Sequence, residues 1–424
     1  MNKQYKFHAV KNYLSLNLNP WFIVLFILLI FNPKKLCSQA YISYQASLDT
    51  ALKNNLEVKN QKLMASYQKQ LTKTAYNIPN TNLSVGYGQI NSIYFDNQLS
   101  ASQTINFPNV YSNQKKVLNQ QWQNANLNIQ LKEHELKKLV KEEFYTLAFL
   151  LEKEKLLLES DSTYAEFLIK SEFRLAKGES NILEKTTAES QRGMIKIQLM
   201  QIKQDIQFYK TQFQFLLNTE TNFEPQYPQL KLASSFKFDS SLLIEHPFLK
   251  VLLQQKNLST ANTALEKSKL LPDIIVSYNN MSMRGNGADN LFYGGANRFQ
   301  SAQIGIGIPL LSGTQRAKVM ASNINQMIAE NNYLTEKLKL EKQFEAAVSQ
   351  YRNNINILNY YEQITLKNAD EILKIANIQF VNGEINYLDW AVLVNQSISI
   401  KNNYLDAVKN YNDNIVLLNY LIGG

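Results

Sequence analysis

The chain has 424 residues, 45% of them hydrophobic, and contains 23 tyrosines and 21 phenylalanines but only 14 glycines and 9 prolines. So few breakers predict long uninterrupted elements, whereas a globular enzyme usually needs more turns. The first 38 residues hold five lysines and no acids, so the remainder carries 39 basic against 35 acidic residues and the net charge falls from +9 to +4. That small excess argues against a nucleic-acid-binding protein.

The N-terminus has the features of a secretory signal peptide over residues 1–40. Lysines precede an unbroken apolar run over 21–31, and the small residues Ser38 and Ala40 follow it. The run is shorter than the roughly 20 residues that a membrane-spanning helix needs. We therefore expect an exported chain that is cleaved after Ser38 or Ala40.

The only cysteine, Cys37, lies in this leader. A lipoprotein signal places leucine or a similar residue three positions before the cysteine, and Lys34 stands there instead, which disfavours lipid attachment. The exported part has no cysteine, which excludes a disulfide framework and a thiolate metal site.

The first half of the exported chain, residues 41–217, follows the order helix, β-hairpin, long helix, helix. Stretches without glycine or proline predict the helices, and alternating apolar and polar residues predict the strands. The predicted elements are a helix over 43–76, strands at about 81–107, a long helix over 110–176 and a helix over 181–217. The long one would span about 100 Å at 1.5 Å per residue.

The second half, residues 241–422, repeats this order after a proline-containing linker or equatorial packing segment over 218–240. The predicted elements are a helix ending before Pro272, strands at about 273–308, a long helix over 314–382 and a helix over 386–421. Pro79, Pro108 and Gly178 thus recur as Pro272, Pro309 and Gly383. An internal duplication with a period near 200 residues organises the chain.

The second long helix carries a heptad seam. Its apolar residues alternate at spacings of four and three from Phe344 to Ala376, with Glu362 filling one position. A helix of about 100 Å exceeds the core of a single domain, so it must pack against equally long helices.

The four predicted strands have the length expected of strands that cross a membrane. Their length, about ten residues, matches that of tilted transmembrane strands. Open sheet edges cannot face lipid, and known barrels begin at about eight strands, so a chain offering four must share a barrel with copies of itself. The alternative is a soluble pair of hairpins packed on the helices.

With these features the sequence resembles the TolC family of outer-membrane efflux proteins. The duplicated plan carries the likeness, together with the hairpin exits at Phe107-Pro108 and Ile308-Pro309 and the turns "FRLAKGESNILE" and "IQFVNGEINYLD". The resemblance implies a mainly α protein with a β-barrel part: a homotrimer with a shared 12-stranded transmembrane β-barrel and a trimeric α-barrel reaching through the periplasm.

The resemblance also implies partners. Such channels are passive exit ducts in the outer membrane, with a long periplasmic extension; an inner-membrane pump supplies energy and a periplasmic adaptor joins the two. Outer-membrane lipid surrounds the barrel. The function implied is a tripartite (RND-type) efflux channel for small molecules or metal cations, and the compact 218–240 segment is similar to that of metal-efflux members.

Two similar turns stand between the predicted helix pairs, and their chemistry is that of helix ends. The corresponding residues are Gly178 and Gly383, Asn181 and Asn386, and Glu184 and Asp389. The glycines suit a left-handed helix end, the asparagines can cap the next helix, and the acids three residues later can reach back in a capping box.

The resemblance places these turns at the periplasmic tip, where the aperture closes and the adaptor docks. Asp389 matches the first of two acids that ring the constriction, and the second falls on Val392. Phe380 stands where a tyrosine joins the closed-state lock, Glu184 matches its acidic partner, and Ile385 replaces the arginine. These departures argue against the usual hydrogen-bonded lock. Three Asp389 carboxylates would favour cations; the alternative is a solvated capping acid.

An enzymatic function finds little support. The histidines at 8, 134 and 246 are scattered, and G-x-S-x-G, P-loop and H-E-x-x-H patterns are missing. We expect no catalytic residue, no cofactor, no metal site and no nucleic-acid partner. Met281 and Met283 hint at soft-metal chemistry, but packing at a strand end is the better explanation. A type I protein-secretion channel and, less favoured, a non-channel periplasmic coiled-coil or adhesin are the alternative functions.

Overall fold

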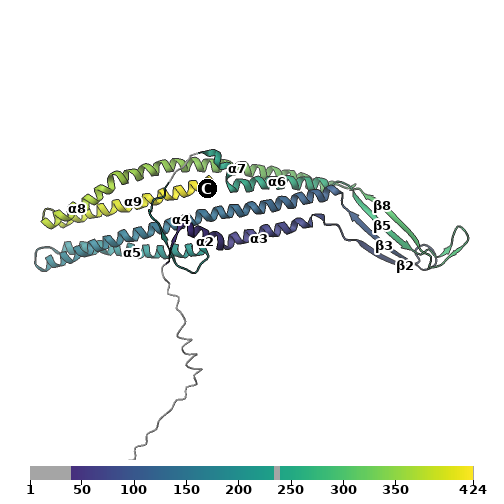
Figure 1. Cartoon of the computed structure of the whole chain (residues 1–424), viewed down its shortest axis with the longest axis horizontal. Coiled ribbons are helices and arrows are strands. Elements are labelled where there is room, and N and C mark those ends of the chain that lie inside the picture. The colour runs from purple at the N-terminus through teal and green to yellow at the C-terminus, as the bar shows by residue number, and fades with distance from the viewer. Residues whose placement is uncertain (1–39, 234–238, 424) are drawn as a thin grey trace, which may run out of the picture.

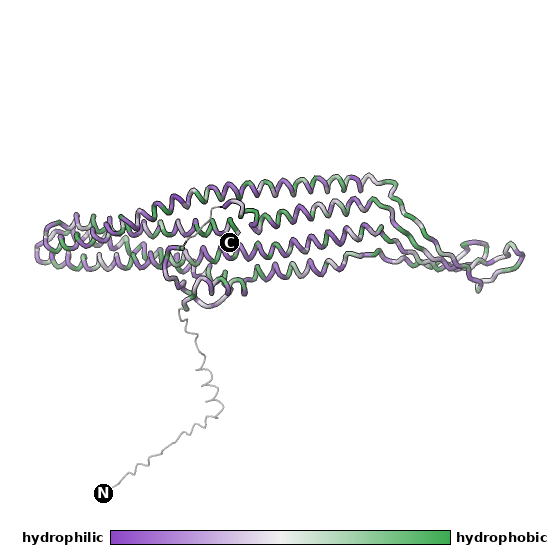
Figure 2. The backbone as a smooth tube through the Cα atoms, turned by 45° about the horizontal axis from the view of Figure 1, so that its top comes forward, coloured by the Kyte–Doolittle hydropathy of each residue, from purple (hydrophilic) through white to green (hydrophobic). Residues whose placement is uncertain are grey.

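The computed structural model describes residues 40–233 and 239–423 as one elongated protomer. A four-stranded sheet lies at one end, and two helical hairpins reach the other (Figure 1). The two halves of the chain run side by side along the whole length, which Figure 2 shows from a second direction. Among the described residues, no helix combines the length and the hydropathy needed to cross a bilayer.

The first half begins with a short strand and ends with a long helical hairpin. Its elements are β1 (Ala40–Ser43), α2 (Tyr44–Asn54), α3 (Leu56–Leu71), η1 (Thr72–Tyr76), β2 (Asn82–Gly88), β3 (Asp96–Ile105), α4 (Pro108–Ala176) and α5 (Ile182–Leu217). The single helix predicted over 43–76 is wrong, because Asn55 divides it. Its side-chain oxygen accepts the N–H groups of Glu57 and Val58, so one residue ends α2 and caps α3.

The second half repeats the plan after β4 (Phe223–Gln226). Its elements are η2 (Ser240–Glu245), α6 (Pro247–Ser268), β5 (Asp273–Met281), β6 (Gly285–Asn286), β7 (Phe292–Tyr293), β8 (Phe299–Gly307), α7 (Gly313–Tyr360), η3 (Tyr361–Thr365), α8 (Leu366–Asn382) and α9 (Tyr387–Leu421). The connection between β5 and β8 contains the two-residue strands β6 and β7, which pair with each other.

The long helix predicted over 314–382 is interrupted by the π-helical turn η3. This turn lies where the seam carries Glu362 instead of an apolar residue. The Nζ of Lys231 donates to that carboxylate at 2.8 Å. The ion pair between Lys231 and Glu362 thus lies at the turn where the helix changes from α to π geometry. Single π turns inside long helices are often found at such special positions.

The segment around residues 218–233 forms a middle layer against the helices. Strand β4 pairs in parallel with β1, so that Ala40 lies opposite Phe223. Farther along, Asn412 of α9 accepts the N–H of Leu232 and donates to the carbonyl of Leu230. The predicted signal peptide and Cys37 lie outside the described residues, except Ala40, which already belongs to β1.

The predicted heptad seam is buried, which confirms its orientation. Its buried members are Phe344, Val348, Tyr351, Leu358, Ala369 and Ala376. Three separate clusters of buried apolar side chains lie along the helical part of the molecule, between the hairpin ends and its middle. Each stabilises neighbouring long helices, because a single helix of this length has no core of its own.

Candidate functional site

The sheet has one apolar and one polar face. Strand order is β2-β3-β5-β8, all antiparallel, and the register places Leu83, Ala101, Tyr278 and Ala302 in one row. Because successive side chains of a strand point to opposite faces of the sheet, this row determines the face on which every other strand residue lies. The apolar face holds Leu83, Val85, Tyr87, Leu99, Ala101, Ile105, Ile274, Val276, Tyr278, Ala302, Ile304 and Ile306, with Gln103 and, at the end next to the outer loops, Asn97, Asn280 and Gln300 as polar members.

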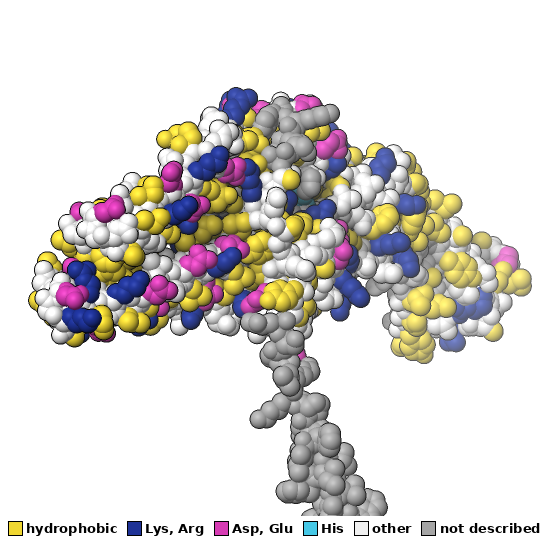
Figure 3. Space-filling view, turned by 60° about the vertical axis from the view of Figure 1, so that its left-hand side comes forward, with side chains coloured by type: hydrophobic (Ala, Val, Ile, Leu, Met, Phe, Trp, Pro, Cys, Tyr) yellow, Lys and Arg dark blue, Asp and Glu magenta, His cyan; other side chains and the backbone are white. Residues whose placement is uncertain are grey.

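The opposite face consists mostly of small or polar side chains, with two carboxylates at the ends of its strands. It holds Asn82, Ser84, Gly86, Gly88, Asp96, Gln98, Ser100, Ser102, Thr104, Asp273, Ser277, Asn279, Ser301, Gln303, Gly305 and Gly307, with Ile275, Met281 and Phe299 as apolar exceptions. A water-soluble sheet would cover its apolar side, yet Val85 and Ile304 are 78% and 82% exposed in the protomer. Hydrophobic side chains gather over this end of the molecule in Figure 3.

Gln103 is a polar exception within the apolar face, and its hydrogen bonds are satisfied locally. Its amide nitrogen donates to the carbonyls of Pro79 and Thr104, and its amide oxygen accepts the hydroxyl of Thr81. Satisfied polar groups can lie in an apolar environment at low cost.

Aromatic pairs flank the apolar face at both ends. Tyr87 stacks on Phe95 near the outer loops, where Tyr94 also meets Phe292 edge to face. Tyr76 stacks on Tyr111 at the end next to the helices, with ring centroids 6.1 Å apart. Bands of aromatic residues at both interfaces are typical of transmembrane β-barrels.

The two hairpin turns have the same backbone geometry. Gly178 and Gly383 have φ values of 74° and 76°, in the left-handed region. After each glycine, the next N–H bonds a carbonyl five residues back: Glu179 to Arg174, and Glu384 to Gln379. These are Schellman helix ends, so the prediction for both glycines is confirmed.

The predicted asparagine caps are present as well. The side-chain oxygen of Asn181 accepts the N–H groups of Leu183 and Glu184, and that of Asn386 accepts the N–H of Asp389 at 3.0 Å. Each cap satisfies N–H groups that the first helical turn leaves unpaired.

The capping box predicted for Glu184 is wrong. Its carboxylate does not reach back to Asn181; it accepts the hydroxyl of Ser180 at 2.6 Å and lies 3.5 Å from the guanidinium of Arg174 on α4. The hydroxyl one residue before the cap is a nearer donor, and the positive charge of Arg174 draws the acid across the turn. Glu184 therefore joins α5 to α4.

Asp389 is exposed, and no side chain of the described residues pairs with its carboxylate. Its backbone N–H is held by the asparagine cap, so the carboxylate projects from the first turn of α9. Ile385 packs partly buried against the apolar cluster, whereas Val392 is exposed. Of the residues singled out by the resemblance, only Asp389 keeps a free charge at this turn.

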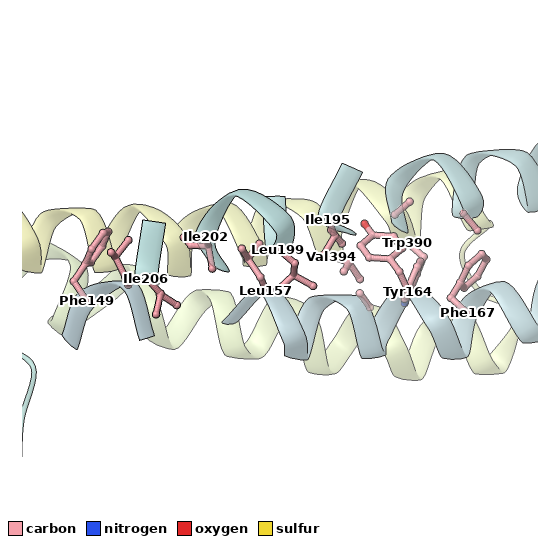
Figure 4. Close-up of a cluster of buried hydrophobic side chains, with 14 of the residues drawn as sticks. Phe149, Leu157, Tyr164, Phe167, Ile195, Leu199, Ile202, Ile206, Trp390 and Val394 are labelled. Carbon is pink, nitrogen blue, oxygen red and sulfur yellow. The ribbon is translucent and has the colours of Figure 1, made fainter. Parts of the chain in front are cut away.

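Phe380 belongs to an aromatic cluster between the two hairpins, in which Phe167 and Trp390 lie close together (Figure 4). Phe167 of α4 lies between Tyr387 and Trp390 of α9, at centroid distances of 4.3 and 4.6 Å, and Phe380 of α8 packs 5.5 Å from Phe167. The indole N–H of Trp390 donates to the side-chain oxygen of Asn377. Rings from three helices thus fasten the second hairpin to the first.

The buried Tyr387 couples this cluster to Glu184. Burial and the carboxylate of Glu184 raise the pKa of the phenol to about 12. The hydroxyl is buried and has no hydrogen-bond partner among the described residues. It lies beside the acid that joins α5 to α4, so the two hairpins meet through both aromatic packing and this polar edge.

A groove of about 1000 Å³ separates the ends of the two hairpins. Phe173 and Glu184 line it from the first hairpin, and Phe380, Ile385 and Asp389 line it from the second. The structure therefore brings most of the predicted tip residues to one surface.

The contacts of Met281 are those of a packed side chain and not those of a soft-metal ligand. The sulfur of Met281 lies 3.7 Å from the amide nitrogen of Asn91, as expected for a side chain at a strand end. No group of three or more His, Asp or Glu side chains is arranged to hold a metal ion within the described ranges 40–233 and 239–423.

Sequence reasoning missed the aromatic cluster. Phe167 and Trp390 are 223 positions apart in the chain and carry no local motif. Their helical periodicity indicates a buried face but does not identify the helix that covers it.

Comparison with known proteins identifies the class. Residues 239–424 match the family described as outer membrane efflux protein. No curated protein sequence matches the chain. Three solved outer-membrane proteins share its fold: OprN (15% identity, TM-score 0.76, 90% of each chain covered), CusC (15%, 0.75, 100% of this chain and 99% of the other) and VceC of Vibrio cholerae (14%, 0.73, 90% and 96%).

The chain has the fold of outer-membrane efflux channels, and residues 239–424 match the outer membrane efflux protein family. The family match covers the second half, and the shared fold covers both halves. The resemblance to the TolC family, the fold class and the location in the outer membrane are confirmed. Because members of this family are channels, the prediction that the chain is no enzyme is confirmed too.

Proposed function

We propose that three copies of this chain form a passive exit duct, with a 12-stranded barrel in the outer membrane continued by an α-helical tunnel. The observation that carries the proposal is the open sheet with one apolar and one polar face. The apolar face contacts lipid and the polar face lines the lumen.

The open edges of the sheet determine the assembly. Strands β2 and β8 each have one unpaired side within the protomer. Unpaired backbone groups in lipid cost several kcal/mol each, so β2 of one protomer must pair with β8 of the next. Such head-to-tail contacts generate a ring when the rotation closes.

The helices offer matching surfaces at the same two edges. Along α7, Met320, Ile324 and Met327 are exposed; along α3, Leu63 and Tyr67 are exposed. Helix α7 follows the edge strand β8 in the chain and α3 precedes the edge strand β2, and the two helices lie on opposite sides of the protomer (Figure 1). In the ring, α7 of one copy packs against α3 of its neighbour, which covers both apolar stripes.

The hairpin ends form the aperture and the docking surface for a periplasmic adaptor. The groove between them, the aromatic cluster and the free carboxylate of Asp389 support this assignment. Three Asp389 side chains around one axis would favour cations. An inner-membrane pump of a tripartite (RND-type) system supplies the energy, and small molecules or metal cations are the cargo.

The test uses the full chain in planar bilayers. We expect a heat-modifiable trimer in outer-membrane fractions that conducts ions, and Asp389→Asn should lower the cation-to-anion permeability ratio. Glu371→Gln removes the same charge from an exposed site on α8 and is the matched control. A monomer in the soluble periplasmic fraction, or a trimer without conductance, would contradict the channel.

A further inference from the structure

The junction between the helices and the sheet carries an excess of positive charge. The segments that form it are 72–81, 106–118, 264–273 and 308–320, which connect the helices to the inner ends of the four strands. We define the basic collar as Lys73, Lys115, Lys116, Lys267, Lys269, Arg316 and Lys318. Only two acids, Glu266 and Asp273, lie in the same segments.

This local excess accounts for the charge of the whole exported chain. Seven basic against two acidic residues give the junction an excess of five, whereas residues 39–424 together carry 39 basic against 35 acidic residues. The rest of the molecule is therefore close to neutral. A charge concentrated at one level of an elongated protein indicates a negatively charged partner at that level.

Most of the collar side chains have no charged partner within the described part of the protomer. All seven are exposed in the protomer. Lys269 pairs with Glu266 at 2.6 Å, and the other six form no ion pair with any described residue. Elsewhere on the long helices, lysines commonly pair with acids three or four residues away, as Lys138 does with Glu142.

Exposed apolar residues lie between the collar and the apolar face of the sheet. The connection from β8 to α7 exposes Leu310 and Leu311, at 85% and 98%, and the connection from η1 to β2 exposes Ile78. Along the long axis, the order is apolar face, apolar connections, basic side chains. Bilayers have the same order, with acyl chains followed by headgroups.

The dimensions agree with this order. Lys115 lies seven residues beyond Pro108, about 10 Å along the helix at 1.5 Å per residue. The headgroup layer is about 5 to 8 Å thick on each side of the bilayer, and a lysine stem extends its ammonium toward that layer.

We propose that the basic collar binds anionic phospholipid headgroups of the leaflet that faces the helical body. The proposal rests on the proposed function, because the apolar face must first lie in the bilayer. Charge complementarity selects anionic over zwitterionic lipid, and the neighbouring apolar connections select a lipid over free phosphate, because only a lipid offers acyl chains beside its charge.

The test uses detergent-purified trimer and native mass spectrometry. The probes are phosphatidylglycerol, phosphatidylcholine of the same chain length, and inorganic phosphate. We expect wild type to retain phosphatidylglycerol in preference to phosphatidylcholine and to bind no phosphate. The variant K115Q/K116Q/R316Q/K318Q should lose this preference by about fivefold or more, and 0.5 M salt should weaken it in wild type through screening, at a Debye length of roughly 4 Å.

A charge-matched control separates the collar from net charge. The variant K155Q/K203Q/K367Q/K374Q removes four lysines that are also exposed and form no ion pair with described residues, but lie away from the junction. It should keep the preference of wild type. If the first variant fails to assemble, K116Q/R316Q and the salt dependence of wild type provide the same comparison.

The outcomes are distinct. An unchanged phosphatidylglycerol preference in the collar variant overturns the proposal. So does a change in ion selectivity with lipid preference intact, because the side chains would then line the tunnel. Binding of inorganic phosphate equal to that of the lipid also overturns it. Failure of the wild-type chain to form a membrane trimer would instead contradict the proposed function.

Discussion

Phe167 of α4 stacks on Tyr387 of α9, with ring centroids 4.3 Å apart and planes inclined by 18°. The two residues belong to different halves of the duplicated chain, so this contact joins the two hairpins rather than the helices within one of them. Trp390 covers the other side of Phe167. A movement of the second hairpin away from the first must separate these rings, or both hairpins must move together.

Phe167→Ala should loosen the tip. Loss of a buried phenylalanine costs about 3 to 5 kcal/mol, and here the loss falls on the contact between the hairpins. We expect a lower thermal midpoint and, in planar bilayers, a higher conductance than wild type. Phe173→Ala is the control, because Phe173 is on the same helix but 60% exposed and should change stability by about 1 kcal/mol or less. Equal effects of the two variants would argue against the cluster.

Gly383→Ala should destabilise the second hairpin. Its φ of 76° is strained for any residue with a Cβ atom, at a cost of about 1 kcal/mol. Gly193 provides the control within α5, where φ is helical and a Cβ would meet no atom within 4 Å. Gly193→Ala should therefore be neutral or stabilising by up to about 1 kcal/mol. Chemical denaturation of the trimer measures both; the prediction fails if both variants change stability in the same direction.

The ends of the helices were predictable because they depend on local chemistry. Proline favours the first turn of a helix and glycine favours a left-handed helix end. The structure begins α4 at Pro108 and ends α4 and α8 beside Gly178 and Gly383, while Pro309 lies in the connection between β8 and α7. The buried side of the second long helix was predictable for a similar reason, since a heptad pattern identifies a face without reference to its partner.

Contacts between distant segments were not predictable. Strand β1 has four residues and pairs with β4, more than 180 positions away, so neither segment has a period of its own. At the tip, the resemblance identified Phe380 but not Phe167, which it contacts. The side chain of Glu184 prefers Ser180 to the cap position because two suitable donors compete, and the spacing of residues does not decide between them.

Acid should destabilise the protein through His246. Burial and the nearby His134 lower its pKa from 6.5 to about 4, and its ring is buried beside Tyr420. Because the folded state disfavours the charged imidazole, this contribution to stability is complete above pH 6.5 and is lost as the pH falls toward 4. The difference corresponds to roughly 3 kcal/mol.

The measurement is the thermal midpoint of the trimer between pH 7.5 and 4.5. His246→Asn keeps a side-chain acceptor for the N–H of Phe248 but cannot titrate, so its midpoint should fall less steeply with acid. Burial raises the pKa of Glu143 to about 7, which acts in the opposite direction in both proteins, so the difference between them reports on His246. Parallel profiles would contradict the prediction.

The assignment of the two sheet faces predicts opposite results for neighbouring residues of β5. Val276 lies on the apolar face between Gln103 and Ile304, and Ser277 lies on the polar face. Val276→Arg should prevent assembly in the outer membrane, because arginine on the lipid face costs about 2 to 4 kcal/mol near the middle of the bilayer. Ser277→Arg should assemble normally and reduce conductance by placing a charge in the lumen. Heat-modifiability of the trimer in membrane fractions measures assembly, and planar bilayers measure conductance. Since both variants introduce the same side chain at adjacent positions of one strand, a general effect on folding would impair both equally and would contradict the assignment of the faces.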